Sequence, residues 1–244
     1  MLVATQEQLS ECLRMLKEDL RFCKDRSLCT EADEVLYCDF EGVSMSRSGE
    51  MCIAQFGTTK HTFVVDLVVL GKGAWDTEIE GVSLRSLLES PVLYKIVFDP
   101  RNDSDSLYHQ FDIKMQSVIC LQLMHIAIQR QEGRIVEYNT GLNTLLRFSI
   151  PGLDNCKMAS IKQAGREMFN QNMNLWRERP LPEILLQYSE LDIEALVPLY
   201  TYFSKQLNPY WMKLVLKHSE NRVLTYLNPQ YDTNNPANRF APSF

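Results

Sequence analysis

The fold of this chain is decided by the stretch Val35-Leu36-Tyr37-Cys38-Asp39-Phe40-Glu41. Apart from its two acids the stretch is apolar or aromatic, a composition typical of a β-strand. A turn follows at residues 46–49, and residues 51–56 and 61–67 are two further strand-like runs. Three strands joined by short turns predict an antiparallel meander.

The rest of the chain alternates briefly between strands and helices and is then mostly helical. Residues 94–98 and 118–121 are expected to be short strands. Helices are expected at residues 83–88, 105–111, 122–131, 142–148, 159–169, 182–206 and 210–216. This order predicts an α/β domain in which helices cover a mixed sheet.

Two flanking segments frame this domain. Apolar side chains from Leu9 to Cys23 recur at helical spacing, so residues 1–33 are expected to hold an amphipathic helix that packs on the domain. The main domain is expected at 34–207. Residues 208–244 are expected to form a C-terminal helix and an irregular tail rich in Asn, Pro and Asp. A chain of 244 residues with 45% apolar content can bury one substantial core.

Charge and cysteine content narrow the class of protein. The net charge of −6 argues against a protein that coats nucleic acid by charge alone, so any such contact must be local. Seven scattered cysteines without C-x2-C spacing favour free thiols in a reducing compartment. The chain also lacks a signal peptide pattern and any apolar run of about 18 residues. We therefore expect an intracellular protein, in the nucleus or cytoplasm, without a membrane partner.

Two acids lie in the first strand. Because strand side chains alternate, Asp39 and Glu41 project from one face and Phe40 from the other. Two like charges on a face that should be core need a compensating cation, and a divalent metal suits them. The alternative is a polar strand end that faces water.

A second acidic feature lies on the long helix near the C-terminus. Tyr188 and Asp192 are four residues apart, and the stripe they share continues through Ala195 and Leu199, so it is expected to face inward. An inward aspartate needs a partner. The alternative is a surface aspartate on a charged helix.

Three further acids follow the strand at residues 94–98. Asp103 lies on the apolar stripe of the next helix, with Leu107 and Phe111, and is the inward candidate. Asp99 precedes a proline at the strand end, and Asp105 is expected to face solvent. The choice between Asp103 and Asp105 stays open at this point.

In this order the motifs resemble the DEDD superfamily of 3′-to-5′ exonucleases, in the ribonuclease D-like branch with tyrosine in its last motif. The resemblance covers residues 34 to 206. It is carried by Leu36 to Gly42 and the strand that follows, by Lys95 to Phe98 leading through Asp103 to Phe111, and by Trp176 to Leu181 with Tyr188 to Asp192. Gln187 stands where the sister branch has histidine. Cys120 stands where relatives commonly carry a helix-capping aspartate.

The resemblance implies a ribonuclease H-like fold and a metal-dependent 3′-to-5′ exonuclease domain at 34–207. It implies that Asp39, Glu41, Asp103 and Asp192 hold two divalent ions, Mg²⁺ or Mn²⁺, and that Tyr188 positions the attacking water. The implied reaction hydrolyses single-stranded nucleic acid to nucleoside 5′-monophosphates. Some members have lost acidic ligands and act as nucleic-acid-binding adaptors, so a catalytically weak or inactive adaptor is the alternative. An unrelated α/β binding protein with surface acids is a third possibility.

A basic segment before the long helix is the predicted grip on a single strand. Its basic and aromatic side chains are Lys157, Lys162, Arg166, Phe169, Trp176, Arg177 and Arg179. Of these we expect Arg179, Trp176 and Arg177 to contact nucleic acid, with Arg179 foremost. The alternative is that Trp176 belongs to the core and the bases form a solvated face. The preference for RNA or DNA and the oligomeric state are not readable from the sequence.

Overall fold

The computed structural model describes residues 1–20, 35–146 and 155–244. Within them one six-stranded sheet has the order β1-β4-β3-β2-β5-β6. The strands are β1 (Leu2–Val3), β2 (Leu36–Val43), β3 (Glu50–Gly57), β4 (Thr62–Asp66), β5 (Lys95–Val97) and β6 (Val118–Cys120). β2, β3 and β4 form the predicted antiparallel meander, and β5 and β6 continue it in parallel with β2. The predicted mixed sheet is confirmed.

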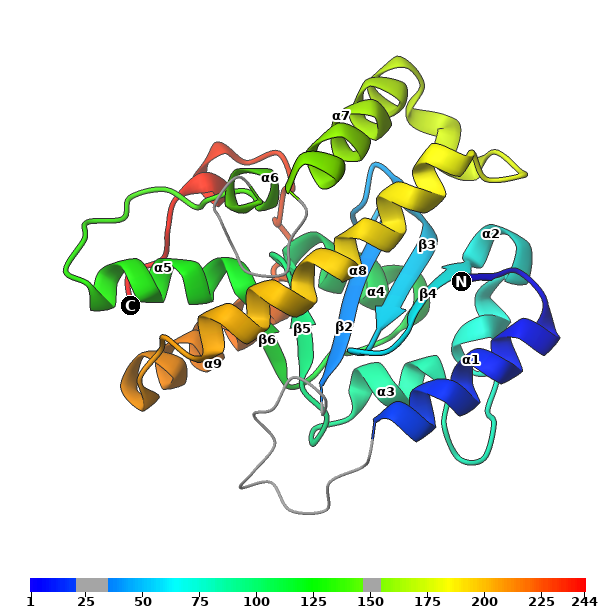
Figure 1. The fold of residues 1–244 in the computed structure, drawn as a ribbon, viewed down its shortest axis with the longest axis horizontal. Helices are drawn as coiled ribbons and strands as arrows, with labels where there is room; N and C mark the ends of the chain where they lie inside the picture. Colours follow the sequence, from blue (N-terminus) through cyan, green and yellow to red (C-terminus); the bar gives the residue numbers. More distant parts are fainter. Residues whose placement is uncertain (21–34, 147–154) are drawn as a thin grey trace.

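Helices cover both faces of this sheet (Figure 1). The α-helices are α1 (Gln6–Asp19), α2 (Leu67–Leu70), α3 (Leu84–Glu89), α4 (Arg101–Phe111), α5 (Leu121–Gln131), α6 (Leu142–Leu145), α7 (Asn155–Gln171), α8 (Glu183–Ser204) and α9 (Pro209–Val223). Short 3₁₀ turns lie at η2 (Lys72–Trp75), η3 (Met173–Arg177), η4 (Leu224–Leu227) and η5 (Pro236–Arg239). The long helix α8 runs across one face of the sheet, and α7 lies beside its N-terminal half.

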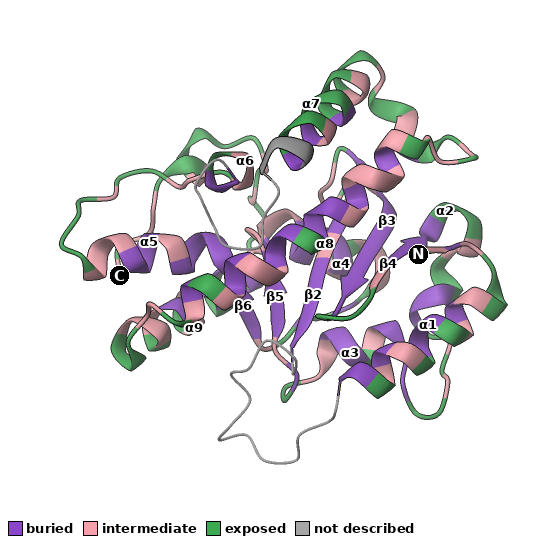
Figure 2. Cartoon of the chain, in the orientation of Figure 1, coloured by how far each residue is buried: buried purple, intermediate pink, exposed green. Residues whose placement is uncertain are grey.

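The alternation of side chains on β2 divides the core into two parts. Leu36, Cys38 and Phe40 pack with α1, α3 and α4 on one face. Tyr37 points to the other face, where it packs against Tyr200 of α8 with ring centroids 6.3 Å apart. Figure 2 shows the strands buried between the two helical layers. Because the period of a strand is two, Asp39 and Glu41 lie on the same face as Tyr37, under α8.

Some expectations are corrected and some lie outside the described residues. The N-terminal residues 2–3 form a strand, β1, that pairs in parallel with β4, and the sequence analysis missed it. The C-terminal helix is longer than expected, from Pro209 to Val223. The last part of the predicted N-terminal helix and residues 147–148 of another fall outside the described residues.

The described helices are each too short or too polar to cross a bilayer. Among the described cysteines, four are buried free thiols, namely Cys12, Cys38, Cys52 and Cys120.

Candidate active site

Three carboxylates meet between the sheet and α8. Asp39 and Glu41 extend from β2, and Asp192 extends from α8 above them, so that one ligand atom of each lies within 4.8 Å of the others. Asp192 is 3% exposed, whereas Asp39 and Glu41 keep partial contact with solvent. The predicted inward direction of Asp39, Glu41 and Asp192 is therefore observed.

Asp103 of α4 is a further buried carboxyl, near enough to Asp39 and Glu41 to interact with their charges but outside the group of three whose ligand atoms meet within 4.8 Å. Burial raises its pKa well above the usual range, and the charges of Asp39 and Glu41 add to the effect. Burial and the charge of Asp192 raise the pKa of Asp39 to about 8. The pKa values of Glu41 and Asp192 are also raised, in both cases mainly by burial. Carboxyl groups crowded in this way favour a bound cation.

Asp105 has a different role from Asp103. It is fully buried, and the expectation that it faces solvent is wrong. The turn between β2 and β3 covers this side of α4: the Arg47 backbone amide donates to Asp105 Oδ2 at 2.7 Å and its guanidinium donates to Oδ1 at 2.7 Å. Asp105 is thus the anchor of an ion pair, which leaves Asp103 as the acid directed to the other carboxylates.

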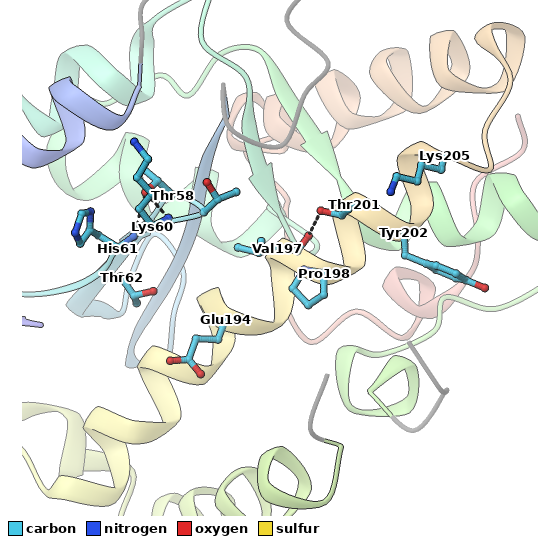
Figure 3. Close-up of a pocket in the computed structure, with 11 residues that line it drawn as sticks. Thr58, Lys60, His61, Thr62, Glu194, Val197, Pro198, Thr201, Tyr202 and Lys205 are labelled. Carbon is cyan, nitrogen blue, oxygen red and sulfur yellow. Dashed lines mark hydrogen bonds between the residues drawn. The ribbon is translucent and has the colours of Figure 1, made fainter. Parts of the chain in front are cut away.

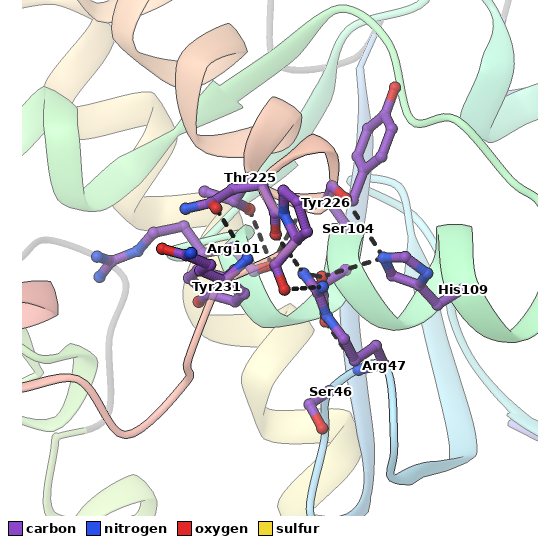
Figure 4. Close-up of polar contacts among 12 residues, drawn as sticks. Ser46, Arg47, Arg101, Ser104, His109, Thr225, Tyr226 and Tyr231 are labelled. Atoms are coloured by element: carbon purple, nitrogen blue, oxygen red, sulfur yellow. Dashed lines mark hydrogen bonds and ion pairs between the residues drawn. The ribbon is translucent and has the colours of Figure 1, made fainter.

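Arg47 also forms hydrogen bonds with the C-terminal segment (Figure 4). Its guanidinium donates to the backbone oxygens of Asn228 at 2.9 Å and Pro229 at 3.1 Å. The Tyr231 hydroxyl donates to Asn102 Oδ1 at 2.6 Å, one residue before Asp103. The helix that carries Asp103 is therefore held from the β2–β3 turn and from the tail.

Tyr188 lies one helical turn before Asp192, under α7. Its ring is so close to α7 that a Cβ added at Gly165 would lie 2.6 Å from Tyr188 Cδ2. Burial and the charges of Asp192 and Glu41 raise the pKa of the phenol. The hydroxyl is protonated at neutral pH, as an unperturbed phenol is, and is available as a hydrogen-bond donor.

The ammonium of Lys162 reaches the carboxylates from α7. It forms an ion pair with Asp192 Oδ1 and lies 3.7 Å from the centroid of the Tyr188 ring. Among the described residues, Asp192 Oδ2 has no hydrogen-bond partner. One oxygen of this buried carboxylate is thus free to take a further ligand.

A cavity of about 360 Å³ opens beside Glu41 and Tyr188. Phe169 and Trp176 contribute aromatic walls, and Trp176 lies edge-on to Tyr188 with centroids 6.2 Å apart. The exposed guanidinium of Arg166 lies at its edge, against the side-chain amide of Asn143. The size is within the range of small-molecule sites.

The three residues expected to contact nucleic acid all have other partners in the structure. Trp176 is 2% exposed, as the core alternative expected, although its edge lines the cavity. Arg179 forms a two-bond ion pair with buried Asp66, at 2.5 Å for each bond. Arg177 pairs with Glu50 at 2.5 Å. Their contact with nucleic acid stays a prediction, and Arg166 is the basic side chain that faces the cavity.

Lys162 and Arg166 appeared in the sequence only as members of a basic segment. The signal that singles them out is their spacing: Lys162, Gly165, Arg166 and Phe169 recur at i, i+3, i+4 and i+7, which is one face of a helix. That face of α7 is the one turned to the carboxylates.

A larger cavity of about 600 Å³ lies elsewhere, between the β3–β4 turn and the outer face of α8 (Figure 3). Lys60, His61, Glu194, Thr201, Tyr202 and Lys205 are among its walls. It contains none of the four carboxylates, so the smaller cavity is the one that belongs to the candidate site.

Comparisons with known proteins give a matching family model and similar proteins. A family model described as 3′-5′ exonuclease matches residues 2–208. Among curated proteins, piRNA biogenesis protein EXD1 of Mus musculus is 26% identical over 174 residues, which is 68% of this chain and 28% of that protein. The chain thus spans less than a third of the length of that relative.

Solved structures share the fold. Trypanosoma brucei RNase D superimposes with a TM-score of 0.70 and 24% identity, covering 93% of this chain and 72% of that chain. The same enzyme in complex with RNA U12 gives a TM-score of 0.67 and 21% identity, covering 93% and 70%.

Proposed function

Because the chain belongs to the 3′-5′ exonuclease family, we propose that it hydrolyses the terminal phosphodiester bond at the 3′ end of single-stranded nucleic acid and releases nucleoside 5′-monophosphates. One observation carries this proposal: one ligand atom each of Asp39, Glu41 and Asp192 lies within 4.8 Å of the others, beside a cavity that Glu41 and Tyr188 line. The three acids come from two segments more than 150 residues apart in the sequence. A merely structural role would not require them to converge.

The donor set fits a hard divalent cation. Mg²⁺ and Mn²⁺ prefer carboxylate oxygens, and Asp192 Oδ2 is a buried oxygen that has no partner in the part of the chain that the structure describes. Asp39, Glu41 and Asp192 would hold one ion, and Asp39 with Asp103 a second. When bound, the ions would supply a water nucleophile at neutral pH and offset the charge on the leaving 3′ oxygen.

The other side chains at the site bind and orient. Tyr188, whose phenol is neutral at pH 7, would orient the attacking water by a hydrogen bond. Arg166 would pair with a phosphate at the mouth of the cavity, since its guanidinium is exposed there. Phe169 and Trp176 would exclude water from the side of the terminal base.

RNA is the substrate class that we favour. Two similarities support it: one neighbour is RNase D in complex with RNA, and one relative is named a piRNA biogenesis protein. The acidic net charge of the chain restricts binding to a local contact, which suits a strand end better than a long duplex.

The test uses 5′-labelled single-stranded RNA and DNA of one sequence, incubated with Mn²⁺, Mg²⁺ or a chelator. We expect a ladder that shortens from the 3′ end, with RNA degraded faster, and no cleavage with chelator or with Asp39→Ala. The matched control is Glu220→Gln, which removes one exposed charge on α9 and should cleave like the wild type.

A substrate with a blocked 3′ end should resist cleavage, whereas a blocked 5′ end should not matter. If the folded wild type binds the strand but cleaves no substrate with either ion, the exonuclease proposal is wrong, and the chain acts as a nucleic-acid-binding adaptor.

A further inference from the structure

Lys162 is a buried cation at the Asp192 side of the candidate metal site. Its side chain is 5% exposed and forms an ion pair with Asp192, one of the three clustered carboxylates. The ring of Tyr188 lies against the same ammonium at 3.7 Å. A lysine is rarely buried to this extent unless it is paired.

The backbone of α7 fixes this lysine in place. Gly165, one turn further along, brings α7 into direct contact with the Tyr188 ring, because any larger residue would collide with it. α7 therefore approaches α8 closely enough for the lysine side chain to reach Asp192 across the ring. The packing of the two helices therefore fixes the Lys162–Asp192 ion pair, in contrast to an ion pair made by a flexible surface side chain.

The ammonium and a divalent ion would need the same carboxylate. An ion held by Asp39, Glu41 and Asp192 would share the Asp192 carboxylate with the Lys162 ammonium. Two cations bound to one buried carboxylate repel each other strongly, because little water lies between them. Asp192 offers Oδ2 as its free oxygen, but Oδ1 belongs to the lysine.

We propose that Lys162 is a built-in competitor for the divalent cation at Asp192, so that metal loading requires the lysine to withdraw from the carboxylate. This inference rests on the proposed function, because it presumes that the carboxylates bind metal. It adds a control over that site: any contact that draws Lys162 away, such as a substrate phosphate, would favour metal binding. Metal and substrate would then bind cooperatively.

The experiment measures Mn²⁺ binding to the purified full chain without nucleic acid, from the electron paramagnetic resonance signal of free Mn²⁺. Lys162→Met should bind Mn²⁺ more tightly than the wild type by about tenfold or more. Lys162→Gln, which keeps a polar group for Asp192, serves as a second variant in case the methionine does not fold. Lys205→Met removes an exposed charge just after the C-terminal end of α8 and should leave the affinity unchanged.

A coupling test locates the effect at Asp192. In an Asp192→Asn background, Lys162→Met should change Mn²⁺ affinity little, because the competition acts through that carboxylate. Equal or weaker binding by folded Lys162 variants, while the wild type binds Mn²⁺ and Asp39→Asn does not, overturns this inference and leaves the proposed function standing. If neither the wild type nor the Lys162 variants bind Mn²⁺ at millimolar concentration, both proposals are overturned.

Discussion

Asp39→Asn is expected to stabilise the metal-free protein, although it removes a residue of the candidate active site. The ligand oxygens of Asp39, Glu41 and Asp192 lie within 4.8 Å of one another. Two unit charges at that distance repel by about 3.5 kcal/mol at an effective dielectric of about 20. Asp39 and Glu41 keep contact with solvent, which screens part of this repulsion, and the Lys162 ammonium paired with Asp192 offsets a further part. A net gain of about 1–2 kcal/mol in the free energy of unfolding is therefore expected.

The gain depends on pH in a defined direction. The pKa of Asp39 in the folded protein, about 8, lies above that of an unperturbed aspartate, 3.8. Between these values the folded state holds a proton that the unfolded state has lost, so the wild type loses stability as the pH rises toward 8. The advantage of asparagine is therefore smallest near pH 4 and full above pH 8.

In the presence of divalent ions the wild type should be more stable than Asp39→Asn, the reverse of the order expected without metal. Mn²⁺ at about 100 times its dissociation constant stabilises a protein that binds it by about 2.7 kcal/mol. The wild type should gain this stabilisation, and Asp39→Asn should lose most of it. Thermal melts followed by circular dichroism at pH 9, in chelator and in Mn²⁺, measure both effects, with about 2–4 °C expected for each kcal/mol.

Two results would refute this reasoning. One is a variant that melts below the wild type in chelator at pH 9, because the carboxylates would then not repel one another. The other is an equal rise of both melting temperatures in Mn²⁺, because the ion would then bind elsewhere. Glu220→Gln, with a charge removed from the surface of α9, should match the wild type in both buffers.

Three further predictions concern other parts of the structure. Arg47→Ala leaves fully buried Asp105 without its guanidinium partner, so the free energy of unfolding in urea should fall by about 3 kcal/mol; a loss below 1 kcal/mol would contradict a stabilising pair. Arg166→Ala should weaken binding of single-stranded RNA and reduce the slope of log binding constant against log salt concentration by about one. Fluorescence anisotropy at several salt concentrations measures both effects, and exposed Arg134→Ala should change neither. Burial lowers the pKa of Lys95 to about 7 in the folded protein, from 10.5 in the unfolded chain. Between these values only the unfolded chain holds the proton, so the free energy of unfolding is highest above pH 10.5 and falls as the pH is lowered to 7. Lys95→Met should therefore flatten the rise in unfolding free energy between pH 7 and 10, and an unchanged slope would show that this lysine stays charged.

Local periodicity made most of the sheet predictable. The alternation in the β2 segment and the turns that follow it specify the meander, because one face of each strand must be apolar. β1 was not predictable: two residues carry no period, and their pairing with Val64 and Val65 depends on where the chain happens to return. The helix boundaries at α4 and α9 differ from expectation by several residues, as helix ends depend on capping and packing.

At the site, the sequence specified the directions of side chains but not their partners. The alternation of side chains on β2 predicts the direction of Asp39 and Glu41, and the apolar stripe of α8 predicts that of Asp192. All three directions are observed. Asp105 was misjudged because the face of α4 opposite Asp103 is covered as well, by a turn 58 residues away in the sequence. The Arg179–Asp66 pair spans 113 residues, and no local pattern reveals such a partner.

Mutations in the segment beyond η4 are expected to affect the candidate site, although no candidate carboxylate lies there. The family match ends at residue 208, yet Tyr231 bonds Asn102, 129 residues earlier in the chain, and Arg47 bonds the backbone of Asn228 and Pro229. A stop codon just after Leu227 would leave all four candidate carboxylates encoded and still remove the contacts that brace the helix of Asp103. Alleles truncated after Leu227 would then share a phenotype with missense alleles of the carboxylates themselves.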